Sequence, residues 1–89
     1  MVRAEVRFSG RVQGVGFRFT CLALSRSHDV TGLVRNEEDG SVYLCAEGMR
    51  SEIEAFIASI QEKMSDFVRN TDVQWSPATG RWSSFDIER

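Results

Sequence analysis

The sequence predicts an α+β fold in which two helices cover one face of an antiparallel sheet. Three patterns predict it: apolar–polar alternation over residues 2–9, a turn signal between two short apolar runs, and an apolar stripe over residues 53–64. A period of two is typical of a half-buried strand, whereas a period of 3.6 is typical of an amphipathic helix. With 89 residues the chain has the length of one small domain, and we expect residues 1–89 to form it.

The first part of the chain predicts two strands separated by a helix. Residues 2–8 alternate and form the first strand, residues 17–27 favour a helix, and residues 30–35 form the second strand. The apolar positions at helical spacing in this helix are Phe19, Leu22 and Ala23.

A hairpin and the most regular helix follow. Asp39-Gly40 between two apolar runs signals a hairpin, so residues 42–47 should form a third strand antiparallel to the second. Ser51 with Glu54 three residues later matches a capping box and predicts a helix start. The apolar stripe of this helix consists of Ile53, Phe56, Ile57, Ile60 and Met64.

The C-terminal segment predicts a strand over residues 68–75, a turn at 77–80 and a last short strand within 81–87. Taken as strand, helix, strand, strand, helix, strand, the order is that of the ferredoxin-like βαββαβ sandwich. In that arrangement the first and third strands are central, and the second strand lies beside the third.

Charge is distributed unevenly along the chain. Residues 1–36 carry six arginines against two acidic residues, whereas the remainder carries five basic and eleven acidic residues. A local basic site on an acidic molecule suits a small anion better than a nucleic acid, which needs a broad basic face. Ten of the eleven basic residues are arginine, the side chain best suited to bidentate phosphate binding.

Composition argues against several other classes. No apolar run reaches the ~20 residues of a membrane span, and the charged N-terminus lacks a signal-peptide core, so we expect a cytoplasmic location and no membrane partner. Two cysteines and one histidine cannot supply four zinc ligands, and the acidic run at residues 37–39 should be a solvated turn. Four residues separate Cys21 from Arg26 and Cys45 from Arg50, one fewer than in a cysteine-phosphatase loop, so we predict two reduced, non-catalytic thiols.

The segment Gly10–Arg18, GRVQGVGFR, leads from the first strand into the first helix and contains three glycines. A glycine-rich turn before a helix presents several backbone N–H groups to one point, and the helix dipole adds positive potential there. Arg18 falls in the first helical turn, where its charge opposes the dipole unless an anion is bound. We therefore predict a small-anion site; the alternative is a tight turn with Arg18 in solvent.

Asn36 ends the second strand, just before the hairpin. An asparagine there commonly starts a turn. It reaches the glycine-rich loop only if the strand lengths allow it, and the sequence leaves both readings open.

Two stretches carry a resemblance to a known family. VRFSGRVQGVGFR at residues 6–18 and GLVRNEEDGSV at residues 32–42 resemble the first strand, phosphate loop, second strand and turn of the acylphosphatases, and SSFDIER resembles their final strand. The resemblance implies the ferredoxin-like fold, hydrolysis of acyl phosphates to carboxylate and inorganic phosphate, and no metal or organic cofactor. It assigns phosphate binding to Arg18 and orientation of the attacking water to Asn36.

The implied reaction needs few groups, because a carboxylate leaves without being protonated. Phosphoryl transfer mainly needs positioning and stabilisation of charge on the equatorial oxygens. We expect Arg18 and loop N–H groups to supply this, with a phosphate-binding loop made of Val12, Gln13, Gly14, Val15, Gly16, Phe17 and Arg18. The expected partners are a small acyl phosphate and, as product or inhibitor, inorganic phosphate or another small anion; we expect a monomer that binds no nucleic acid.

Two other functions fit the same fold. One is a non-catalytic phosphate- or anion-binding module. The other is an RNA-binding domain of the same topology, which the acidic second half of the chain disfavours. Because the aromatic residues are few and scattered, Phe17 and Phe19 are expected in the core rather than on a base-stacking platform.

Overall fold

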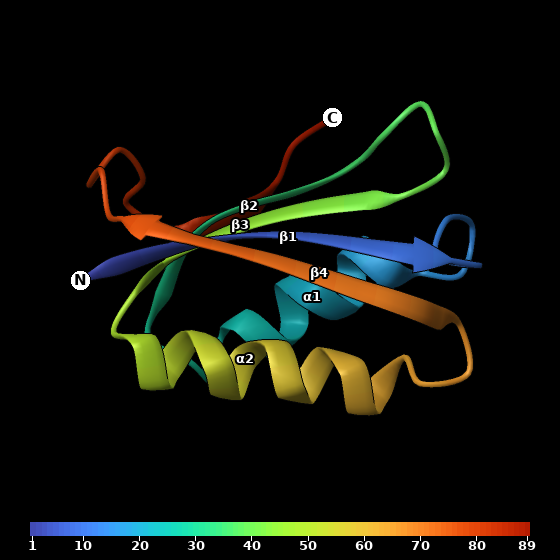
Figure 1. Ribbon diagram of the computed structural model, residues 1–89, viewed down its shortest axis with the longest axis horizontal. Helices are drawn as coiled ribbons and strands as arrows, with labels where there is room; N and C mark the ends of the chain where they lie inside the picture. Colours follow the sequence, from blue (N-terminus) through green and yellow to red (C-terminus); the bar gives the residue numbers. More distant parts are fainter.

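The computed structural model describes residues 1–89 and has one sheet with both helices on the same face (Figure 1). The elements in chain order are β1 (Val2–Gly10), α1 (Phe17–Ser25), β2 (Val30–Asn36), β3 (Val42–Gly48), α2 (Arg50–Lys63), β4 (Val68–Pro77) and β5 (Phe85–Ile87). The strand order across the sheet is β4-β1-β3-β2-β5. The predicted α+β, ferredoxin-like arrangement is confirmed, with β1 and β3 paired in the interior of the sheet and β2 beside β3.

The C-terminal end departs from the prediction. The predicted turn at residues 77–80 begins later, because β4 continues through Pro77. A proline is tolerated there because β4 is an edge strand. Of the predicted last strand, only Phe85–Ile87 forms a strand, β5. β5 pairs with β2 in parallel, whereas every other strand pair is antiparallel.

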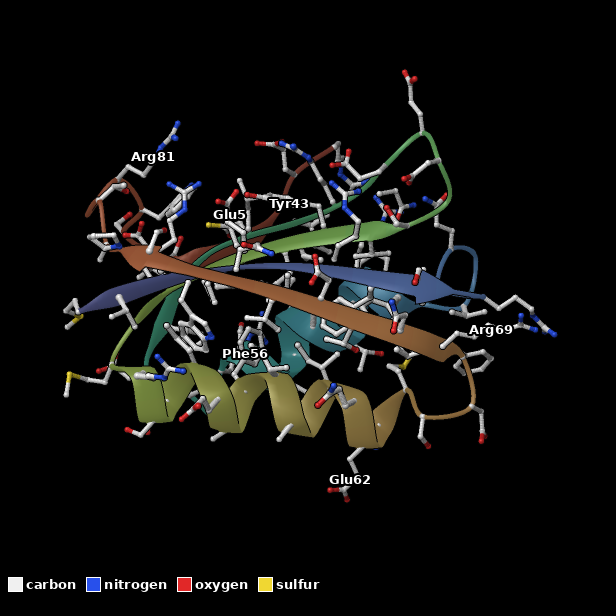
Figure 2. All side chains as sticks on the ribbon, in the orientation of Figure 1. Glu5, Tyr43, Phe56, Glu62, Arg69 and Arg81 are labelled. Carbon is white, nitrogen blue, oxygen red and sulfur yellow. The ribbon has the colours of Figure 1, made fainter.

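The core lies between the sheet and the two helices. Alternate residues of β1 point toward the helices and are fully buried, namely Ala4, Val6 and Phe8. The predicted stripe of α2 is buried in full, with Phe56 between the helix and the sheet while Glu62 points away (Figure 2). No helix in the structure is both long and apolar enough to cross a membrane.

The predicted core face of α1 is wrong for Phe19 and Ala23, which are exposed, whereas Leu22 packs, partly buried, against the core. The buried residues of α1 are Phe17, Cys21 and Ser25, which are spaced by four, while Phe19 is exposed. Phe17 and Phe19 lie about 200° apart around a helix, so both cannot face the core. Phe17 is therefore a core residue, as expected, and Phe19 is not.

The predicted capping box at the start of α2 is also wrong. The helix begins at Arg50, its N-cap is Met49, and no side chain caps it. β3 pairs with both of its neighbours as far as Gly48, which leaves one residue before the helix. Ser51 therefore lies inside the first turn rather than at its entrance.

The sheet register brings two predicted functional segments together. Val42 of β3 lies opposite Phe8 of β1 on one side and opposite Asn36 of β2 on the other. Asn36 therefore shares a row of the sheet with Phe8, two residues before the end of β1. The loop after β1 and the β2–β3 turn lie at the same end of the molecule (Figure 1).

Candidate active site

A small cavity lies where the loop after β1 enters α1. Its volume is about 110 Å³. The lining residues are Val12, Gly14, Gly16, Phe17, Arg18, Phe19 and Asn36. Arg18 and Asn36, which are 18 positions apart, thus line the same cavity. The sequence left open whether Asn36 reaches the loop, and the register of β2 brings it there.

The backbone at the start of α1 is shaped by two glycines. Gly14 and Gly16 have φ angles of 77° and 76°, a left-handed conformation that costs other residues energy. Gly16 is the N-cap; no side chain caps the helix, and no acidic residue lies in its first turn. The N–H groups of this turn consequently have no side-chain partner, which leaves them available to an anion.

Arg18 and Asn36 carry unused hydrogen-bonding capacity. The ion pairs of the chain use Arg3, Arg7, Arg35 and Arg50. Arg18 forms none, and neither its guanidinium nor the amide of Asn36 forms a side-chain hydrogen bond. Arg18 is the one charged residue that lines the cavity, so the cavity combines a cation, a free amide and uncapped N–H groups.

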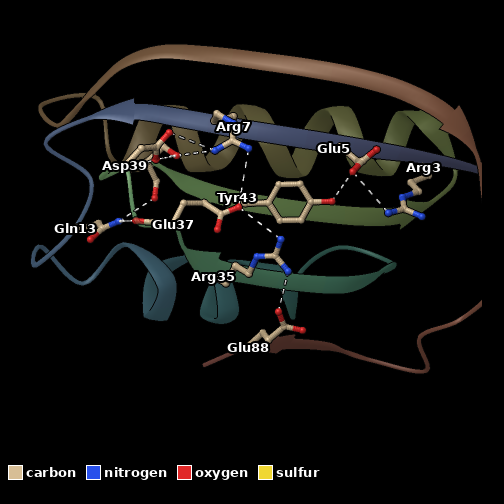
Figure 3. Close-up of polar contacts among 10 residues, drawn as sticks. Arg3, Glu5, Arg7, Gln13, Arg35, Glu37, Asp39, Tyr43 and Glu88 are labelled. Atoms are coloured by element: carbon tan, nitrogen blue, oxygen red, sulfur yellow. Dashed lines mark hydrogen bonds and ion pairs between the residues drawn. The ribbon is translucent and has the colours of Figure 1, made fainter.

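Two residues of the predicted loop do not line the cavity. Val15 packs, partly buried, against the core. The Gln13 side chain reaches the β2–β3 turn, where its Nε2 donates to the main-chain carbonyls of Glu37 at 2.8 Å and Ser41 at 2.9 Å (Figure 3). Sequence reasoning missed this link, because nothing in a local pattern signals a hydrogen bond across 28 positions.

The acidic turn after Asn36 is held by arginines. Arg7 lies 3.9 Å from Glu37 and 3.8 Å from Asp39 in ion pairs, and it donates a 2.8 Å hydrogen bond to the Ser41 hydroxyl (Figure 3). Hydrogen bonds from the Ser41 hydroxyl and N–H hold the pKa of Asp39 below its usual value. These contacts fix the turn next to Asn36 from the side of the sheet that the helices leave open.

The cysteines lie away from this chemistry. Cys21 and Cys45 are free and buried. Burial raises the pKa of Cys21 to about 12 and also raises that of Cys45, so neither is a thiolate near neutral pH.

The one histidine, His28, packs beside Phe56, with ring centroids 5.7 Å apart. No group of three or more His, Cys, Asp or Glu side chains is arranged to hold a metal ion.

Two other hollows of the surface contain acidic side chains, unlike the cavity at the start of α1. One, of about 390 Å³, lies between the end of β1 and the α2–β4 turn, where Asp66 accompanies Arg11 and Arg69. A hollow of about 170 Å³ on the open sheet face contains Glu5 and Asp72 beside Arg7. In the smaller hollow the acidic side chains outnumber the arginine, which does not favour an anion, and in the larger one Asp66 offsets one of the two arginines.

Comparisons with known proteins agree over nearly the whole chain. Residues 4–87 match the family model described as Acylphosphatase. An acylphosphatase of Salinibacter ruber is 44% identical over 88 residues, which cover 98% of this chain and 93% of that protein. The crystal structure of acylphosphatase from Bacillus subtilis matches with a TM-score of 0.89 and 26% identity, covering 100% of both chains. T. kodakarensis HypF matches with a TM-score of 0.84 and 27% identity over 99% of this chain but 12% of that one.

Proposed function

We propose that this chain, which belongs to the acylphosphatase family, hydrolyses acyl phosphates in the cavity at the start of α1. Membership confirms the resemblance seen in the sequence and makes the chain a hydrolase. The products are a carboxylate and inorganic phosphate. The observation that carries the proposal for this site is that Arg18 and Asn36, both without side-chain partners, line one small cavity.

The phosphoryl group is bound by the loop and Arg18. Backbone N–H groups of the loop residues that line the cavity surround it, and the Arg18 guanidinium adds charge-assisted hydrogen bonds. In an empty helix Arg18 opposes the dipole, whereas with a dianion in place both attract the ligand. Charge that develops on the equatorial oxygens in the transition state meets the same donors.

Asn36 holds the attacking water. Its amide supplies both a donor and an acceptor, so it can fix the orientation of a water as well as its position. The carboxylate leaving group needs no proton, so a general acid is unnecessary. The water proton passes to a phosphate oxygen, and the P–O bond to the acyl group breaks as the bond to the water oxygen forms.

A non-catalytic anion-binding module is the second candidate. The match to a small part of the longer HypF supports it, because the same fold there is one piece of a larger chain. Such a module would retain the donors of the cavity and bind phosphate without turning over a substrate.

An assay with benzoyl phosphate separates the two candidates. The purified protein is incubated with the substrate, and hydrolysis is followed by the loss of its absorbance, with inorganic phosphate added as a competitor. The enzyme predicts turnover that phosphate inhibits competitively. Phosphate binding without hydrolysis above background would favour the module and contradict the enzymatic proposal.

The free, buried cysteines also fit the proposed setting. Reduced thiols are typical of a cytoplasmic compartment. We therefore propose a cytoplasmic location for the enzyme. As the sequence predicts, we also propose that it acts as a monomer on a small acyl phosphate.

A further inference from the structure

Phe19 is a side chain of the cavity that phosphate binding does not use. It is 62% exposed, and Met1 and Met49 are the other large apolar residues exposed on the chain. Single exposed apolar residues are common and need no explanation by themselves. Phe19 differs from the two methionines because it lines the same cavity as Arg18 and Asn36.

The cavity is too small to enclose a whole substrate. Its volume of about 110 Å³ lies well below the roughly 300–1,000 Å³ of pockets that enclose drug-sized ligands. The phosphoryl group and the water occupy it in the proposed reaction. The acyl group must therefore lie outside, against whatever surface borders the opening.

Phe19 is the apolar surface available there. The other two apolar residues that line the cavity, Val12 and Phe17, are 1% and 2% exposed, so their side chains are committed to the core. The helical phase of α1 explains the difference: Phe17 and Cys21 face the core, which turns Phe19 outward in the first turn, next to Arg18.

We propose, on the basis of the proposed function, that the Phe19 ring is the docking surface for the acyl group of the substrate. The enzyme then prefers acyl phosphates whose acyl group is aromatic or extended and apolar over small ones such as acetyl phosphate. Phe19 is a specificity-determining residue, whereas Arg18 and Asn36 act on the phosphoryl group and the water.

The test compares two substrates in matched variants. kcat/KM is measured for benzoyl phosphate and acetyl phosphate with the wild type, Phe19→Ala, Phe19→Tyr and the control Met49→Ala. Binding of benzoylphosphonate and acetylphosphonate, which are not hydrolysed, is measured by calorimetry on the same proteins. An aromatic contact predicts that Phe19→Ala lowers kcat/KM for benzoyl phosphate about threefold to tenfold, mainly through KM.

The same variant should leave kcat/KM for acetyl phosphate and inhibition by inorganic phosphate within twofold. Phe19→Tyr should keep the preference for benzoyl phosphate, and Met49→Ala should change nothing. Equal losses for both acyl groups, or no loss for either, would overturn the docking role. Absence of all hydrolysis by the wild type would instead contradict the proposed function, and the phosphonate affinities would still decide the role of Phe19.

Discussion

The side-chain amide of Gln13 donates a 2.9 Å hydrogen bond to the main-chain carbonyl of Ser41, and a 2.8 Å bond to Glu37 accompanies it. Gln13 belongs to the loop proposed to bind phosphate, and the two carbonyls belong to the turn that follows Asn36. In the proposed reaction, the distance between the bound phosphoryl group and the water held by Asn36 therefore depends on this link. Reaction rates are sensitive to such placement, since a displacement of about 1 Å can cost about 10²-fold.

Gln13→Leu should lower kcat roughly tenfold while KM and inhibition by phosphate stay within about twofold. The substitution keeps a similar volume but removes both donors, so Asn36 is less well fixed relative to the loop. Steady-state kinetics with benzoyl phosphate provide the measurement. Gln61→Leu, at an exposed position of α2, is the matched control and should leave kcat unchanged. A rise in KM with unchanged kcat would show that Gln13 acts on binding instead.

Arg18→Ala should remove most of the phosphate affinity and most of the activity. Loss of charge-assisted hydrogen bonds to a buried anion costs about 2–3 kcal/mol, or on the order of 10²-fold in the inhibition constant of phosphate. The fold should not suffer, because Arg18 forms no ion pair and opposes the dipole of α1; its removal should leave the melting temperature unchanged or slightly higher.

Arg26→Ala is the control for Arg18, since it removes the same charge from the other end of the same helix. It should leave phosphate inhibition unchanged. An Arg18→Ala enzyme that phosphate still inhibits at the wild-type concentration would show that the backbone N–H groups alone bind the anion.

Asn36→Ala should separate turnover from binding. If the amide positions the water, kcat falls by about 10²-fold or more, whereas phosphate, which the loop and Arg18 bind, inhibits nearly as before. Asn70→Ala on the edge strand β4 is the matched control. Hydrolysis by Asn36→Ala at the wild-type rate would rule out the water-holding role.

The sequence predicted those features that depend only on residues close to one another in the chain. The glycine-rich loop with Arg18 and the stripe of α2 are of this kind. The outward position of Phe19 was not predicted, because hydrophobicity alone does not fix the phase of a nine-residue helix. The bonds of Gln13 and the buried position of Glu47 depend on strand register, which brings distant segments together and which a single sequence does not specify.

Gly16→Ala should destabilise the protein and weaken phosphate binding together. A left-handed φ of 76° costs an alanine roughly 1–2 kcal/mol, although a Cβ there would meet nothing within 4 Å. The natural control is Gly80→Ala, with φ of 73° and equally open surroundings. Both variants should melt at lower temperature, but only Gly16→Ala should raise the inhibition constant of phosphate. Equal phosphate affinity in the two variants would show that the loop backbone does not contact the anion.

Glu47 fastens the β4–β5 connection and makes stability depend on pH. Glu47 on β3 is 4% exposed. Its carboxylate accepts hydrogen bonds from the N–H and hydroxyl of Thr79 at 2.9 and 2.8 Å and from the N–H of Gly80 at 2.8 Å. Burial alone would raise the pKa of Glu47, but these bonds outweigh it and the pKa lies below its ordinary 4.5. A lowered pKa in the folded state means that the carboxylate stabilises the fold above about pH 4.5, and that this contribution is lost as the pH falls through the folded-state value.

Glu47→Gln should therefore lower the melting temperature at pH 7, since an amide replaces the charged acceptor of three donors. A loss of about 1–2 kcal/mol corresponds to roughly 4–16 °C for a domain of this size. The difference in melting temperature between wild type and variant should become smaller below pH 4, where the wild-type carboxyl is increasingly protonated. The control is Glu62→Gln, because the Glu62 side chain points away from the sheet (Figure 2). This variant should have the same melting temperature as the wild type at every pH. Because Thr79 and Gly80 do not line the cavity, kcat for benzoyl phosphate at 25 °C should be unchanged. A difference in melting temperature that is as large at pH 3 as at pH 7 would mean that the charge of Glu47 is not what holds the connection.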